Sequence, residues 1–187
     1  MRTNSTTVVA AIWLLLATAC GDGESGSTTM TTLAATSAGP TEAATMRLTS
    51  TAFAEGETIP SEYTCDGEGV SPPLQIDAVP ETTETLVLII ADPDAPAGTW
   101  DHWVAFDIAP TAEIPRDVGA LGTPGVNSFG TIGYGGPCPP SGSHRYVHQV
   151  YALDAALGLP EGASKAEVLE AMEGHVLAEA TITGLYR

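Results

Sequence analysis

Apolar positions beyond residue 46 fall into short runs or alternate with polar ones, and Gly or Pro bounds most of these segments. This pattern is typical of β-strands that are buried on one or both faces. Residues 85–91 (TLVLIIA) are almost entirely apolar, as expected of a central strand with both faces buried. Further strands are predicted over residues 103–108 and 145–153, and weaker ones over 48–53, 74–76 and 180–186. We therefore expect a mainly β domain.

One helix is predicted near the carboxyl end of the chain. Ser164 and Glu167 have the spacing of a capping box, in which each side chain accepts the backbone N–H of the other residue. The apolar residues that follow recur on one helical face: Val168, Leu169, Met172 and Val176. We predict a helix over residues 164–176, and any other helices should be few and short.

The N-terminus has the order of an export signal, with a basic residue, an apolar run and small residues before a cysteine. Arg2 precedes the apolar residues 8–17, which are too few for a transmembrane helix of about 20 residues. Cys20 follows Ala-Thr-Ala, and this ending resembles the lipobox of bacterial lipoproteins, in which the cysteine is lipidated. We predict a signal peptide over residues 1–20 and a lipid-anchored protein in the bacterial cell envelope, outside the cytoplasm. Ordinary secretion is the alternative.

A linker is predicted between this signal and the β domain. Of the 25 residues from 21 to 45, 19 are Ser, Thr, Gly or Ala, and none is aromatic. Such a segment buries too little apolar surface to offset the entropy lost on ordering it. Residues 21–45 are therefore predicted to be a flexible tether, and residues 46–187 the folded domain.

The charge of the chain excludes one class of partner. It has 23 Asp and Glu against 6 Lys and Arg, a formal net charge of -17 and a sequence pI near 4.2. Nucleic-acid binding requires clustered basic side chains that neutralise phosphates, and the sequence has no such cluster. We therefore expect no nucleic-acid partner, and contact with a membrane only through the N-terminal lipid.

Two loop segments hold most of the candidate chemistry. The first is DPDAP at residues 92–96, followed closely by His102, and the second is GYGGPCPPSGSHRY at residues 133–146. Asp92 and Asp94 are two residues apart at the end of the predicted central strand, so both carboxylates face one side if the chain stays extended. Burial of a carboxylate is costly without a partner, and each segment supplies a histidine.

Together these segments resemble the two signature segments of the phosphatidylethanolamine-binding protein family, in its bacterial branch of Raf-kinase-inhibitor-like proteins. The resemblance extends to YTCDG at residues 63–67, to SPPL at 71–74 and to the closing residues 178–186, so it covers nearly all of the predicted domain. It implies antiparallel sheets packed face to face with few short helices. It also implies a small anion-accepting pocket where the two loops meet.

The family's pocket carries over to residues of both loops: Asp92, Asp94, His102, Gly136, Pro137, His144, Arg145 and Tyr146. The imidazoles of His102 and His144 and the N–H of Gly136 can donate to a phosphate or carboxylate oxygen, while an aspartate orients a histidine. The resemblance therefore implies a module that binds a small anion or a phospholipid head group, with regulation or inhibition of an unspecified partner protein as a further role. We predict no enzyme activity, catalytic residue, cofactor or metal.

Two other functions are open to the same residues. A small esterase or phosphatase would use His102 or His144 as base and Ser141 or Ser143 as nucleophile, although the chain has no GxSxG motif. A metal site is the other alternative, because four side chains are of suitable ligand types: Asp92, Asp94, His102 and His144. The sequence lacks a helical HxxxH or a CxxC spacing for such a site. His148, on the same predicted strand face as His144, is expected to have a surface or core role.

The remaining two cysteines form an even pair once Cys20 is assigned to lipidation. Cys65 lies in YTCDG and Cys138 in GPCPP, so both are near the implied pocket, and the predicted compartment is oxidising. We predict a disulfide between them. The alternative is two separate buried thiols.

Overall fold

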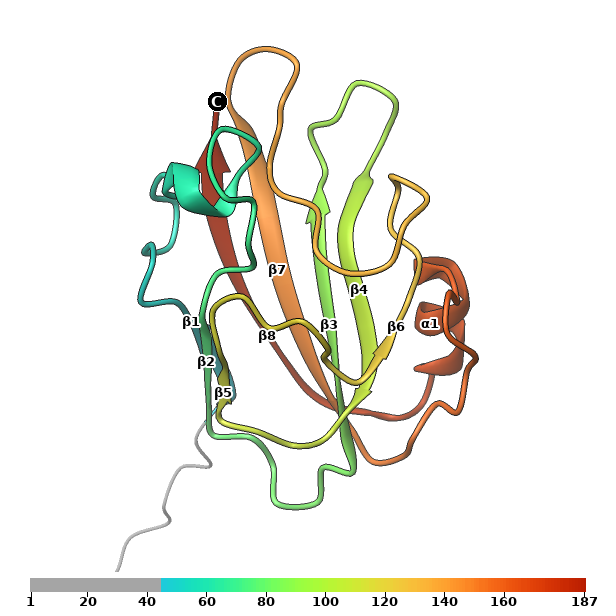
Figure 1. Cartoon of the computed structure of the whole chain (residues 1–187). Helices are drawn as coiled ribbons and strands as arrows, with labels where there is room; N and C mark the ends of the chain where they lie inside the picture. The colour runs from blue at the N-terminus through green and yellow to red at the C-terminus, as the bar shows by residue number, and fades with distance from the viewer. Residues whose placement is uncertain (1–44) are drawn as a thin grey trace, which may run out of the picture. The chain divides into compact units, whose positions relative to one another are not determined.

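The computed structural model describes residues 45–187 (Figure 1), so the predictions for the signal peptide, for Cys20 and for the tether before residue 45 lie outside the described residues. None of the described helices is long and apolar enough to cross a membrane. The elements follow in this order: β1 Arg47–Thr49, the 3-10 turn η1 Ser61–Tyr63, β2 Leu74–Asp77, β3 Thr85–Asp92, β4 Trp100–Ile108, β5 Glu113–Ile114, β6 Thr123–Pro124, β7 His144–Leu153, α1 Lys165–Ala171 and β8 Val176–Tyr186.

Two antiparallel sheets make up the fold. The larger has the strand order β6-β4-β3-β7-β8, and the smaller has the order β1-β2-β5. β3 is the middle strand of the larger sheet, and all eight of its residues are buried. This confirms the central strand expected from its unbroken apolar run. The mainly β fold with two packed sheets is confirmed as well.

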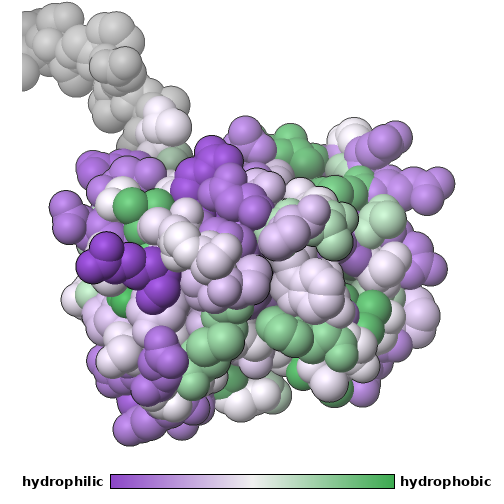
Figure 2. Space-filling view, turned by 90° about the horizontal axis from the view of Figure 1, so that it is seen from above, coloured by the Kyte–Doolittle hydropathy of each residue, from purple (hydrophilic) through white to green (hydrophobic). Residues whose placement is uncertain are grey.

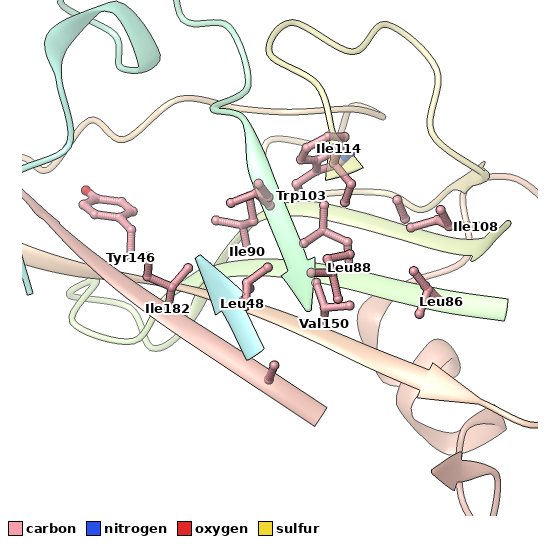
Figure 3. Close-up of a cluster of buried hydrophobic side chains, with 14 of the residues drawn as sticks. Leu48, Leu86, Leu88, Ile90, Trp103, Ile108, Ile114, Tyr146, Val150 and Ile182 are labelled. Carbon is pink, nitrogen blue, oxygen red and sulfur yellow. The ribbon is translucent and has the colours of Figure 1, made fainter. Parts of the chain in front are cut away.

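The alternation of side chains along β3 divides the hydrophobic core into two clusters. Leu86, Leu88 and Ile90 pack with residues of the small sheet, whereas the residues between them pack on the opposite side, which α1 covers. Figure 3 shows the first cluster, with Tyr146 at one end and Leu86 and Ile108 at the other. The core therefore continues without a break to the end of the sheet where the two signature loops lie.

The ends of several strands differ from the prediction. β1 ends at Thr49 instead of reaching residue 53, because the Ser50 hydroxyl donates to the carbonyl of Pro73 (2.7 Å) and accepts the N–H of Ala52 (3.1 Å), which turns the chain. β4 and β8 begin earlier than predicted, at Trp100 and Val176. β5 and β6, with two residues each, are too short to show a period in the sequence.

The helix is also shorter than predicted. The capping box of Ser164 and Glu167 is present, and α1 begins at Lys165 as expected. The helix ends at Ala171, shortly before Gly174, whose φ of 83° is incompatible with a right-handed helix. As a result, Val168 and Met172 are buried against the sheet, whereas Leu169 is 38% exposed and Val176, 45% exposed, starts a strand. The predicted four-residue apolar face was therefore wrong in two of its members.

Candidate ligand-binding site

A pocket of about 270 Å³ opens at the end of the large sheet where β3 finishes and β4 begins. Figure 2 views the molecule from this end and shows hydrophobic residues exposed among hydrophilic ones. Side chains from both signature segments and from the loop between them line the pocket: Asp92, Ala95, Pro96, Ala97, Trp100, His102, Phe129, Cys138 and Pro140. The predicted meeting of the two loops is therefore present.

His102 reaches the pocket because of a β-bulge. Ile90 pairs with Trp103 and Ala91 pairs with Asp101, so His102 is the extra residue in β4 and has no partner across the ladder. A bulge of this kind redirects a side chain and is frequent beside binding sites. Here the His102 ring packs edge-to-face on Tyr146, with ring centroids 5.2 Å apart.

The hydrogen bond of His102 determines what its ring can offer a ligand. Nδ1 lies 2.7 Å from the carbonyl oxygen of Gly135, which can only accept, so Nδ1 carries a proton. Burial of the ring lowers the pKa of His102. The neutral ring therefore presents Nε2 as an acceptor, and it becomes a donor at Nε2 only when the histidine is protonated.

Asp92 and His144 form a buried pair beside the pocket. Asp92 is the last residue of β3 and His144 the first of β7, and they are only 3% and 7% exposed. Nδ1 of His144 lies 2.7 Å from one carboxylate oxygen of Asp92, and the other oxygen accepts the N–H of Asp94 at 2.8 Å. This confirms that an aspartate orients one of the two histidines.

Asp94 and Arg145 lie beside the pocket and are not among its lining residues. The hydrogen bond from Asp94 N–H to Asp92 turns the chain after β3, so the two carboxylates do not share one side as an extended chain would place them. Asp94 instead accepts three hydrogen bonds from Arg145, one from its backbone N–H and two from its guanidinium. These bonds hold the pKa of Asp94 well below its ordinary value. The pair fastens the loop of residues 93–99 to the start of β7.

Tyr146 has an unpaired hydroxyl next to Asp92 and His102, and it is not itself a lining residue of the pocket. The residue is completely buried, and its hydroxyl has no hydrogen-bond partner within residues 45–187. Burial, followed by the nearby charge of Asp92, raises the pKa of Tyr146, so the hydroxyl stays protonated. A buried hydroxyl without a partner is uncommon in folded proteins and costs about 1–3 kcal/mol.

Gly136 and Pro137 shape the loop behind the pocket and do not line it directly. A Cβ on Gly136 would lie 3.0 Å from backbone atoms of Thr64, so a side chain here requires this backbone to shift by a few tenths of an ångström. The buried Pro137 accepts the N–H of Cys65 through its carbonyl at 3.1 Å. Both residues therefore connect the second signature loop to the segment that follows η1.

The predicted disulfide is present. Cys65 and Cys138 are bonded, with Cα atoms 5.5 Å apart and a separation of 73 positions in sequence. Both residues are exposed, and Cys138 lines the pocket. The bridge joins the wall of the pocket to the loop after η1.

The apolar wall of the pocket is the part that the sequence did not predict. Phe129 lies outside both signature segments, and its ring packs edge-to-face on Trp100 and on His102, each with ring centroids 5.4 Å apart. Its ring is 49% exposed at the pocket. An aromatic residue in the Gly- and Asn-containing stretch NSFG was the only signal for it. His148 is buried against Phe53 with ring centroids 5.4 Å apart, which places it in the core.

The structure does not assemble the two alternative sites. Ser141 and Ser143 are exposed and are not lining residues of the pocket. Within residues 45–187, no group of three or more His, Cys, Asp or Glu side chains is arranged to hold a metal ion. The four candidate ligands are instead divided between the Asp92–His144 pair, the Asp94–Arg145 pair and the separate hydrogen bond of His102.

Known proteins are similar to this chain in sequence. A UPF0098 protein of Methanothermobacter thermautotrophicus is 55% identical over 142 residues, which are 72% of this chain and 94% of that protein. A UPF0098 protein of Aquifex aeolicus is 49% identical over 144 residues, which are 72% of this chain and 84% of that protein.

Two crystal structures extend the similarity to the fold. A phosphatidylethanolamine-binding protein homolog of Chlamydia trachomatis aligns with a TM-score of 0.75 and 42% identity, covering 76% of this chain and 97% of that one. YbcL of Escherichia coli, described as a member of the mammalian PEBP family, aligns with a TM-score of 0.71 and 31% identity, covering 77% and 99%.

Two antiparallel sheets packed face to face, with a His/Asp-lined pocket at the end of the central strand, define the class of protein. The family model described as phosphatidylethanolamine-binding protein matches residues 49–187. The chain belongs to this family, as the sequence motifs predicted.

Proposed function

We propose that the domain binds a small anionic group in this pocket, such as phosphate, a phosphomonoester or a phospholipid head group, and releases it unchanged. The observation that carries this proposal is the buried hydroxyl of Tyr146, which has no partner within residues 45–187 and lies next to two lining residues of the pocket, Asp92 and His102. A ligand oxygen that accepts this proton removes the cost of leaving the hydroxyl unpaired. Nδ1 of His144 donates its proton to Asp92, so Nε2 of the neutral ring is an acceptor and Tyr146 is the donor.

The charge of the site makes anion binding dependent on protons. His102 is neutral near pH 7, because burial lowers its pKa. A bound anion favours the charged form of His102 and raises that pKa. Binding therefore takes up a proton, and affinity rises as pH falls toward the pKa of His102 in the free protein.

The walls of the pocket favour an anion with an apolar substituent. Trp100 and Phe129 line the pocket in contact with each other, and Pro96 and the neighbouring alanines line it as well. A ring or short alkyl chain attached to the anion would cover these surfaces, which contribute about 25 cal/mol per Å² of apolar area removed from water. Phenyl phosphate should therefore bind more tightly than inorganic phosphate.

Titration calorimetry of residues 45–187 with phenyl phosphate and phenyl sulfate tests this proposal. Phenyl sulfate keeps its charge between pH 6 and 8, so a tighter affinity at pH 6 reports on the protein. We expect micromolar to millimolar dissociation constants, and a loss of about tenfold in His102→Ala, which removes one charge-assisted hydrogen bond. His175→Ala is the matched control, because His175 is exposed and bonded to Asp154 away from the pocket.

Two outcomes would overturn the binding proposal. One is equal binding of phenyl sulfate by the parent protein and by His102→Ala. The other is hydrolysis of p-nitrophenyl phosphate at a rate that His102→Ala or His144→Ala abolishes, which would establish the hydrolase alternative.

We also propose that Cys20 is lipidated and that the domain lies outside the cytoplasm. The Cys65–Cys138 bridge supports this location, because structural disulfides persist mainly in oxidising compartments. In cells that express the full chain, Cys20→Ser should move the protein from the membrane fraction to the soluble fraction. Retention of Cys20→Ser in the membrane fraction would contradict the anchor.

A further inference from the structure

A second cavity lies beside Trp103, and none of its lining residues also lines the candidate pocket. Its volume is about 390 Å³, within the usual range of about 300–1,000 Å³ for small-molecule sites. Residues 118–122 form one wall, and residues 132–134 form another. Trp103 and Tyr134 meet there edge-to-face, with ring centroids 5.7 Å apart.

The polar groups of this cavity suit a cation and not an anion. Glu161 is its only carboxylate, and no Lys, Arg or His is among the lining residues. Within residues 45–187, Glu161 makes no ion pair and no side-chain hydrogen bond. Burial raises the pKa of Tyr134, so its phenol stays neutral. Its hydroxyl already donates its proton to the carbonyl of Tyr63 at 2.7 Å.

The aromatic rings and the acidic charge of the domain also favour a cationic ligand. The π-face of Trp or Tyr attracts a cation, with a contribution of about 0.5–2 kcal/mol that increases with desolvation. Residues 46–187 contain 20 Asp and Glu against 5 Lys and Arg, so the surrounding field concentrates cations at the surface. An organic cation with an apolar body satisfies the rings and the carboxylate together.

We propose that the cavity between residues 118–122 and 132–134 is a second binding site, which takes a small organic cation with an apolar body. The cationic group lies against the Trp103–Tyr134 pair, and Glu161 at the exposed mouth of the cavity provides the counter-charge. This site is independent of the anion pocket, because the two sets of lining residues have no member in common.

Gly119 is a position in the cavity wall where a larger side chain can be introduced. It lines the cavity, a Cβ built on it meets nothing within 4 Å, and its φ is not in the positive range. Gly119→Leu therefore adds a side chain at the cavity without backbone strain. We expect it to block the second site while binding of phenyl sulfate in the first pocket stays unchanged.

Titration with benzyltrimethylammonium, followed by the indole N–H resonance of Trp103 in the nuclear magnetic resonance spectrum, tests the proposal. We expect a saturable shift that benzyl alcohol and benzoate do not produce at the same concentration, and no shift in Gly119→Leu. Glu161→Gln should weaken the affinity about three- to fivefold, as for a partly exposed charge pair. Glu173→Gln is the matched control, because it removes the same charge from an exposed residue that does not line the cavity.

Several results would overturn this inference. Equal shifts with benzoate or benzyl alcohol would show that the cavity does not select a cation. An unchanged affinity in Gly119→Leu, with its fold verified by circular dichroism, would place the ligand elsewhere. The absence of a Trp103 shift at millimolar benzyltrimethylammonium would refute the site itself, while phenyl sulfate binding would still report separately on the anion pocket.

Discussion

Four histidines in this domain have four different surroundings, and the surroundings decide their chemistry. His102 lines the pocket through a bulge, and His144 is buried against Asp92. His148 is buried in the core and His175 is exposed beside Asp154. The sequence motifs predicted that the first two bind a ligand; the structure places His102 at the pocket, whereas His144 is not one of its lining residues. Strand alternation put His148 on the same face as His144 and could not show that Phe53 covers it, because that contact joins distant segments.

Buried His148 should make the domain sensitive to acid. Burial lowers its pKa from 6.5 to about 4. The unfolded chain therefore binds this proton at a higher pH than the folded one, so stability is unaffected above pH 6.5 and falls as the pH drops from 6.5 toward 4. At pH 5 the loss from this residue should be about 2 kcal/mol in the free energy of unfolding.

Urea denaturation at pH 7.5 and pH 5 measures this effect. The difference in the free energy of unfolding between the two pH values should shrink in His148→Leu and should persist in His175→Ala. His102 contributes with the same sign, because its pKa is also lowered, so some acid sensitivity remains in His148→Leu. An unchanged difference in His148→Leu would show that His148 does not titrate as its burial implies.

At the scale of elements, the sequence predicted those whose apolar pattern is long enough to show a period. β3, β4 and β7 were found, and all have eight or more residues. β5 and β6 were missed because two residues have no period. The bulge in β4 was missed because its cause is the pairing with β3, which the local sequence does not record. That bulge nevertheless sets the direction of His102.

The contact between the second signature loop and the loop after η1 should tolerate no side chain at Gly136. In Gly136→Ala the new methyl would lie 3.0 Å from backbone atoms of Thr64, so one of the two loops must move. Overpacking of this kind costs about 1–3 kcal/mol, and the shift should also weaken phenyl sulfate binding. Thermal unfolding and calorimetry would measure both effects.

Gly119→Ala is the control for this substitution. Its Cβ meets nothing within 4 Å, and its φ does not require glycine, so its melting temperature should equal that of the parent or exceed it slightly. If Gly136→Ala has the same melting temperature and the same phenyl sulfate affinity as Gly119→Ala, the close approach to Thr64 does not shape the pocket.

For the molecule as a whole, the sequence predicted the class of fold and two polar residues of the pocket wall, Asp92 and His102. Asp92, His102, His144 and Tyr146 come together as the resemblance implied. The aromatic wall could not be predicted, because Phe129 reaches the pocket from a segment outside both motifs. The excess of acidic residues could be predicted from composition, but the role proposed for Glu161 depends on which loops enclose a cavity.

The disulfide links two loops that are far apart in the sequence of the described domain, and its removal should lower stability without weakening ligand binding in the pocket. It joins Cys65 to Cys138 across 73 residues, and a cross-link of this length restricts the unfolded chain by about 2–4 kcal/mol. The same two loops remain joined by the Tyr134 hydroxyl bond to Tyr63 and by the Cys65 N–H bond to Pro137. We therefore expect urea denaturation of Cys65→Ser/Cys138→Ser to show the full stability loss, while phenyl sulfate affinity changes less than about threefold, or roughly 0.6 kcal/mol.

The parent protein in a phosphine reductant should match the double variant, and the double variant should not respond to the reductant. A stability loss below about 1 kcal/mol, or loss of phenyl sulfate binding by a folded double variant, would contradict this division between the bridge and the hydrogen bonds.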